Sequence, residues 1–136
     1  MNERGSITPL VIGFTVMLVM LVGVVVNASA AFLKRQQLNS LADAAALAAT
    51  EGVEGEQVYT GGLGERAEID PAVARARAAD QLLAAGVAGL RFRIVTRTDS
   101  VTVHLDAPID LPFRIGDLGQ AVMISGSGTG VVTVSE

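Results

Sequence analysis

Few residues in this 136-residue chain could carry out catalysis, and no spacing among them indicates a catalytic site. His104 is the sole histidine, and it lies in an alternating stretch typical of a strand. Acid–base or nucleophilic catalysis by histidine requires a partner group within hydrogen-bond reach. Ser125 and Ser127 lie among glycines without the pattern of a nucleophile elbow. We therefore predict no catalytic residue and a chain that is not an enzyme.

The sequence also predicts neither a metal site nor a cofactor site. Cysteine is absent, which excludes disulfides, thiol chemistry and cysteine-ligated zinc. Asp106, Asp110 and Asp117 lack the spacing of a calcium-binding loop. Gly61-Gly62-Leu63-Gly64 lacks the lysine of a phosphate-binding loop. The net charge is -4 and the basic residues are scattered, so nucleic acid is not an expected partner.

A long apolar stretch, Ile7 to Val26, dominates the N-terminal part of the chain and contains no charged side chain. About 20 helical residues span about 30 Å, which is the thickness of the hydrocarbon core of a bilayer. We predict a transmembrane helix at about residues 7–27, preceded by a short polar head at residues 1–5. In the alternative interpretation the stretch is a signal peptide cut after Ala30, because Ala28-Ser29-Ala30 resembles a signal-peptidase site.

The helix is expected to continue into water, giving one continuous helix over residues 6–50 that ends near Gly52. Alanine, leucine and glutamine favour helix throughout this part. One apolar stripe on it consists of Leu38, Leu41, Ala45 and Ala48. This stripe could pack on the chain's own sheet, the interpretation that we favour, or on the helix of another copy.

Three further residues are candidates for helix contacts. Gly13 and Gly23 would let another helix approach the membrane segment closely. Asp43 lies among alanines. Its carboxylate is either solvated, which we favour, or paired with an arginine of the domain or of a neighbour.

Residues 51–70 are predicted to be a flexible connector with a short strand at 57–60, and residues 71–136 a small domain. Asp70-Pro71 is typical of a helix start, and Gly86 or Gly89 of its end. Within this helix Val73, Ala76, Leu83 and Val87 are expected on one side.

A hairpin is predicted from residues 91–97 and 101–107, which both alternate. A turn at Asp99-Ser100 would place Ile94 opposite Leu105 and Arg93 opposite Asp106. Pro108 and Pro112 are expected to end the strand, and Ile109, Leu111 and Phe113 to be apolar anchors of a following loop. Residues 121–124 and 130–134 are predicted strands, divided or bulged by SGSGTG. The expected fold is α+β: a long N-terminal helix carrying one helix packed on a three- to four-stranded antiparallel sheet.

Charges near the membrane ends do not fix the orientation of the chain. Arg4 lies on one side of the apolar stretch, and Lys34 and Arg35 lie on the other. The positive-inside rule slightly favours the domain inside the cell, but Lys34 and Arg35 are about two helical turns beyond Val26.

The first part of the chain resembles the N-terminal region of TadE/TadG-like proteins of tight-adherence (Flp) pilus systems. The matching pieces are Arg4-Gly5-Ser6, the junction from Asn27 to Lys34, and Gln37 to Ala49. Family members look like R-x-x-L-Q-x-A-A-D-A-A-A-L-A-A at the last of these. The residues from Asp43 to Ala49 match that pattern almost completely, and the resemblance covers about the first two-fifths of the chain.

The resemblance implies a pilin-like or pseudopilin-like protein of the plasma membrane, with its domain outside the cell. Expected partners are the lipid bilayer and other pilus or envelope proteins, in a homo- or hetero-oligomer formed through the N-terminal helix. Gly5-Ser6 fits a prepilin cleavage site, although Leu10 stands where pilins carry glutamate. Asn27 stands where the family usually has aspartate. The alternative function is a membrane-anchored extracytoplasmic binding module that acts alone.

Overall fold

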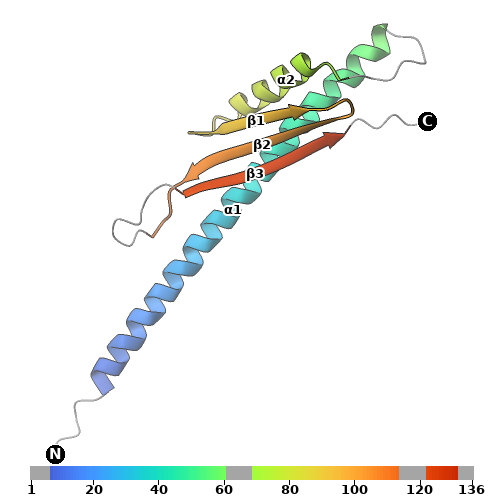
Figure 1. Ribbon diagram of the computed structural model, residues 1–136. Coiled ribbons are helices and arrows are strands. Elements are labelled where there is room, and N and C mark those ends of the chain that lie inside the picture. The colour runs from blue at the N-terminus through green and yellow to red at the C-terminus, as the bar shows by residue number, and fades with distance from the viewer. Residues whose placement is uncertain (1–6, 61–68, 114–121, 132–136) are drawn as a thin grey trace, which may run out of the picture.

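The computed structural model describes residues 7–60 (side chains to residue 51), 69–113 and 122–131 (Figure 1). The elements in order are helix α1 (Ile7–Thr60), helix α2 (Pro71–Ala84), and strands β1 (Arg91–Thr96), β2 (Ser100–Ile109) and β3 (Val122–Val131). The strands form one antiparallel sheet in the order β1-β2-β3. The expected α+β fold with a long N-terminal helix is therefore confirmed.

Helix α1 is longer than the sequence predicted. It runs to Thr60, whereas we expected an end at Thr50, and it passes through Gly52. The strand predicted at residues 57–60 was wrong, because these residues are helical. The extension contains two glycines, Gly52 and Gly55. Each costs a helix only about 1 kcal/mol, and the glutamates and glutamine around them favour helix.

Helix α2 begins where Asp70 and Pro71 predicted. The Asp70 Oδ1 atom accepts hydrogen bonds from Ala72 N at 2.8 Å and Val73 N at 3.5 Å. The helix ends at Ala84, and Gly86 follows with φ +63°.

The buried side of α2 differs from the predicted one. It consists of Ala74, Ala78 and Leu82 at steps of four residues, whereas Leu83 is 70% exposed. Small side chains at Ala74 and Ala78 let α2 lie close to the alanines of α1 in a shared core.

The hairpin β1–β2 forms, but its register is shifted by two residues. Ile94 lies opposite Val103 rather than Leu105, and Arg93 lies opposite His104 rather than Asp106. Arg97 N donates to Ser100 O at 2.8 Å, so the two-residue turn is Thr98-Asp99, one residue earlier than predicted. A shift of two residues keeps every side chain on its predicted face.

Pro108 does not end β2 as expected, because the strand continues to Ile109 and Pro108 lies opposite Met123 of β3. The pairs with β1 end at Asp106. Beyond that point β2 has a neighbour on one side only, and a strand edge tolerates a missing N–H.

Strand β3 is continuous through the segment SGSGTG, so the predicted division into two strands was wrong. Its ten residues pair with β2 without interruption, from Val122 opposite Ile109 to Val131 opposite Ser100. The glycines occupy every second position. They therefore share one face of the sheet.

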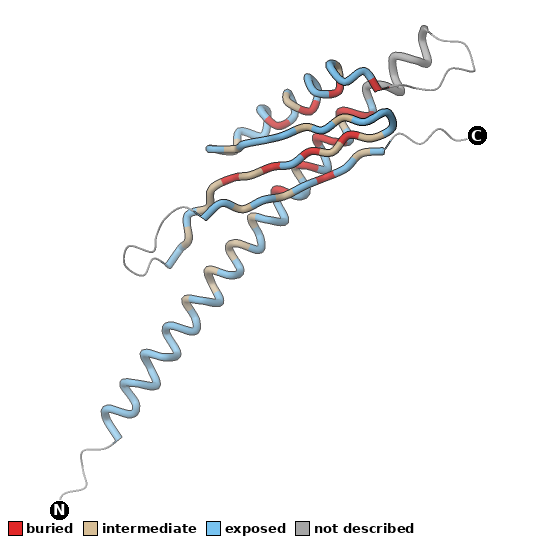
Figure 2. The backbone as a smooth tube through the Cα atoms, in the orientation of Figure 1, coloured by how far each residue is buried: buried red, intermediate tan, exposed pale blue. Residues whose placement is uncertain are grey.

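Both helices cover the same face of the sheet, and the core lies between the helices and that face (Figure 2). The core contains the β2 side chains Val101, Val103, Leu105 and Ala107. The N-terminal half of α1 projects away from this domain (Figure 1).

Candidate membrane anchor and packing surface

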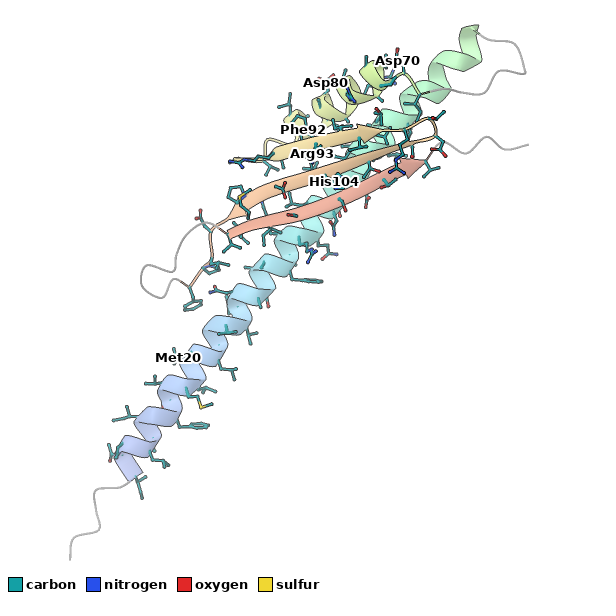
Figure 3. All side chains as sticks on the ribbon, in the orientation of Figure 1. Met20, Asp70, Asp80, Phe92, Arg93 and His104 are labelled. Atoms are coloured by element: carbon teal, nitrogen blue, oxygen red, sulfur yellow. The ribbon has the colours of Figure 1, made fainter. Side chains whose placement is uncertain are left out.

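The N-terminal half of α1 exposes large apolar side chains on all sides. Ile7 is 76% exposed, Phe14 67% and Met17 71%. Met20 likewise points away from the rest of the chain (Figure 3). Among the described residues, α1 is the one helix that is long and apolar enough to cross a membrane. A helix that is apolar all round and is not covered by its own domain fits a lipid environment.

The two glycines that were predicted to admit a neighbouring helix have different surroundings. A Cβ atom placed on Gly13 would meet nothing within 4 Å. A Cβ atom placed on Gly23 would lie 3.8 Å from Cγ of Phe113, which is ordinary van der Waals contact. The ring of Phe113 therefore packs on α1 at Gly23, whereas no described residue lies against Gly13.

Asn27 holds the segment after β2 against α1. Its Nδ2 donates to Phe113 O at 2.9 Å, and its Oδ1 accepts from Phe113 N at 3.1 Å. An amide side chain offers both a donor and an acceptor, which a carboxylate cannot do. We call this pair of hydrogen bonds the Asn27–Phe113 clamp. It joins residues 86 positions apart.

Further along, α1 lies directly on the backbone of β3. Cβ atoms placed on Gly126 and Gly130 would come within 2.7 Å of Leu38 Cβ and Ala46 O. A Cβ atom on Gly128 would overlap the backbone of Ala42 and Asp43. We call these three glycines the glycine pad. Any larger residue there would force the helix and the strand apart.

The predicted apolar stripe of α1 packs on the chain's own domain. Leu38 and Ala45 are buried at 1% and 0% exposure, and Leu41 and Ala48 are half-buried. The stripe also includes Ala42, Ala46 and Ala49. Because its centre is covered by the domain, the stripe is not available to the helix of another copy.

Two polar residues of α1 border this contact. Asn39 Oδ1 accepts a hydrogen bond from Ser127 N of β3 at 3.1 Å. Asp43 is exposed, and its backbone lies against Gly128. Asn39 thus adds a directional contact to the otherwise apolar packing.

The outer face of the sheet is polar and open. His104 is exposed opposite Arg93, and Ser125 Oγ donates to Asp106 Oδ1 at 2.5 Å. A shallow depression of about 760 Å³ lies here, with Arg35 and Arg91 among its lining residues. In the part of the chain that the structure describes, no three His, Cys, Asp or Glu side chains gather as a metal site would require.

The predicted cleavage site Gly5-Ser6 lies outside the described residues. So do Gly61–Gly64 and Asp117, which the sequence did not predict to bind phosphate or a metal.

The sequence of the N-terminal segment matches one known protein family. Residues 5–67 match the family model described as "Putative Flp pilus-assembly TadE/G-like". This segment is TadE/G-like. No curated protein and no solved structure was found to match the chain. The TadE/G-like segment contains the apolar helix and its alanine stripe, whereas the whole sheet lies outside the matched range.

Sequence reasoning missed the glycine pad and the Asn27–Phe113 clamp. Gly126, Gly128 and Gly130 alternate with serine and threonine, which is the period of a strand with one side-chain-free face. The sequence interpretation instead placed a division or a bulge between two strands at these glycines. The clamp had no comparable signal, because Asn27 and Phe113 are distant in sequence.

Proposed function

We propose that this chain is a non-catalytic component of a Tad/Flp-type pilus assembly or of a related secretion machine. Helix α1 anchors it in the plasma membrane, and the α+β domain lies on the extracytoplasmic side. The observation that carries the proposal is the TadE/G-like match over residues 5–67, the segment with the membrane-span-like helix. The match supports a role in pilus assembly, and the orientation and the pilin-like or pseudopilin-like role are our inference.

Lateral packing between apolar helices is the mechanism that we propose for assembly. In lipid, helices associate through close van der Waals contact, which small residues permit. Gly13 supports such contact, since none of the residues that the structure describes covers it. The domain then occupies the stripe from Leu38 to Thr50, so neighbouring chains would meet along the first half of α1.

Complementation of a deletion strain tests this mechanism. Gly13→Leu should reduce surface pili about tenfold, the effect of losing about 1.4 kcal/mol of helix contact. Val11→Leu is the matched control, because it places leucine on nearly the opposite side of the same segment, where Val11 is 53% exposed. Equal piliation by both variants would eliminate Gly13 as a contact. Normal pili in the deletion strain itself would refute the assembly role.

Intact mass of the membrane-bound protein distinguishes the possible roles. A mature start at Ser6 indicates prepilin-type processing and incorporation into a pilus or pseudopilus. A start at Met1 or Asn2 indicates a permanently anchored assembly factor. A start at Ala31 indicates a cleaved signal peptide and contradicts the membrane anchor.

The depression on the outer face favours one alternative, a membrane-anchored binding module that acts alone. Arg35, Arg91 and Arg93 line it and would suit an acidic ligand. Co-purification from membranes separates the two functions. An assembly component should bring envelope proteins with it, whereas a lone module should remain a monomer without them.

Asp43 provides a narrower test. It is exposed in this chain, so a partner chain could pair with its carboxylate. Asp43→Lys should reduce piliation if such a pair exists. Unchanged piliation would show that Asp43 has no specific role.

A further inference from the structure

The end of the domain nearest the apolar half of α1 carries exposed apolar side chains. Phe113 is 49% exposed, Val122 41% and Met123 46%. Val122 and Met123 begin β3, paired with Ile109 and Pro108. We call Phe113, Val122 and Met123 the membrane-proximal tip.

The position of Phe113 along α1 places the tip at membrane level. Its ring packs at Gly23, and the clamp fixes its backbone to Asn27. Gly23 precedes Val26, the end of the apolar stretch, by about 4.5 Å of helix. If residues 7–26 lie in hydrocarbon, a ring packed at Gly23 lies inside the boundary of that layer.

The start of β3 lies at nearly the same level. Gly130 packs beside Ala46 and Gly126 beside Leu38, so β3 descends toward the apolar half of α1 as its residue numbers fall. Continued at the same spacing, Val122 lies about one helical turn beyond Val26. This is the depth of the lipid headgroups.

Basic side chains lie just above the tip. Arg35, Arg91 and Arg93 line the depression on the outer face, and Lys34 precedes Arg35 on α1. The acidic side chains in the same region are engaged: Asp106 accepts a hydrogen bond from Ser125, and Asp110 is not without a partner. Apolar side chains below basic ones are typical of proteins that rest on an anionic lipid surface.

We propose that the membrane-proximal tip inserts into the lipid surface beside α1, so that the domain is docked on the bilayer rather than free above it. The occupant is lipid because Phe113 lies on a helix turn that is itself within the apolar stretch. The clamp orients the ring, and the tip then fixes the tilt of the domain. This inference rests on the membrane anchorage proposed above.

Depth-dependent fluorescence quenching in the full-length protein tests the docking. The natural chain has no cysteine, so a single introduced cysteine carries the only label. Met123→Cys reports on the tip, and Val131→Cys, at the opposite end of β3, is the matched control. Leu18→Cys reports on the middle of the apolar stretch. The labelled proteins are placed in phosphatidylcholine–phosphatidylglycerol vesicles that contain spin-labelled lipids. The spin label lies near the headgroup for the two β3 positions and deep in the acyl chain for Leu18.

The label at Met123 should be quenched at least about threefold more strongly than the label at Val131, because only the former lies at headgroup depth. Adding Phe113→Ser should remove most of that difference while quenching at Leu18 remains. Equal quenching at Met123 and Val131, with Leu18 quenched, would overturn the docking and leave the anchor intact. Weak quenching at Leu18 would overturn the anchor and the docking together.

Discussion

Between Ile7 and Val26, α1 carries large apolar side chains on every side, whereas between Leu38 and Thr50 it buries mainly alanine along one side. In the proposed lipid environment, covering the first segment would bring no hydrophobic gain, so its side chains would need only to be apolar. The second segment lies on the backbone of β3 and must be narrow. Within one helix, large side chains are therefore found where the domain leaves α1 uncovered, as the proposed lipid anchor requires, and small ones where α1 meets protein backbone.

Gly128→Val should have the largest effect on stability, because the close approach of α1 to β3 requires glycine at this position. The new side chain would overlap the backbone of Ala42 and Asp43, which cannot move as a side chain can. We expect a loss of more than about 3 kcal/mol in the free energy of unfolding. Denaturant unfolding of the domain in detergent measures it.

Ser127→Val is the matched control for that substitution. It places the same side chain on the exposed outer face, one residue away, and should change stability by less than about 0.5 kcal/mol. Equal losses in the two variants would show that strand propensity, and not the glycine pad, limits position 128.

A lysine in each half of α1 tests the lipid side of the comparison. Leu18 and Leu47 are 50% and 54% exposed, so contacts within the chain cover the two side chains to a similar extent. Leu18→Lys should oppose membrane insertion by about 3 kcal/mol, whereas Leu47→Lys should insert normally. Carbonate-resistant membrane association measures both. If Leu18→Lys inserted as well as Leu47→Lys, the apolar half would not lie in lipid.

Leu38→Ala should reduce stability by about 2–3 kcal/mol, because it leaves a cavity at the largest buried side chain of α1. Leu47→Ala removes the same atoms from an exposed site and should change stability by less than about 0.5 kcal/mol. Thermal unfolding followed by circular dichroism compares them. A loss at Leu47 as large as that at Leu38 would mean that both sides of the second half are covered.

Asn27→Ala should have the smallest effect, about 1 kcal/mol, because it removes the clamp at the boundary between the two halves. Hydrogen exchange at the amide of Phe113 should accelerate several-fold. Asn27→Asp keeps the acceptor and loses the donor, so exchange should be intermediate. Unchanged exchange in Asn27→Ala would show that the clamp does not hold this segment.

Local patterns predicted the elements that local chemistry determines. The uncharged stretch after Gly5, the Asp70-Pro71 start and the alternation in β1 and β2 each act within a few residues. The hairpin register was wrong by one turn position, because Thr98-Asp99 and Asp99-Ser100 place the same side chains on each face.

The features that sequence reasoning missed depend on distant partners. The glycines of β3 resemble a loop until α1 lies against them, and Pro108 resembles a strand end until β1 is known to stop short of it. For the packing surface, the small residues of α1 identified the stripe. The identity of what covers that stripe could not be read locally, because Asn39 and Ser127 are 88 residues apart.

The distance in sequence between α1 and β3 also determines the order in which the packing contacts can form during synthesis. The alanine stripe leaves the ribosome long before the glycine pad, so the part of the stripe that packs on β3 stays uncovered until β3 emerges. Contacts of such long range form late and slowly. A chain that stopped after β2 would leave uncovered the part of the stripe that lies on β3, and exposed apolar surface of this kind promotes aggregation. The packing of β3 on α1 is therefore the step that completes the cover of the stripe and lowers the tendency to aggregate.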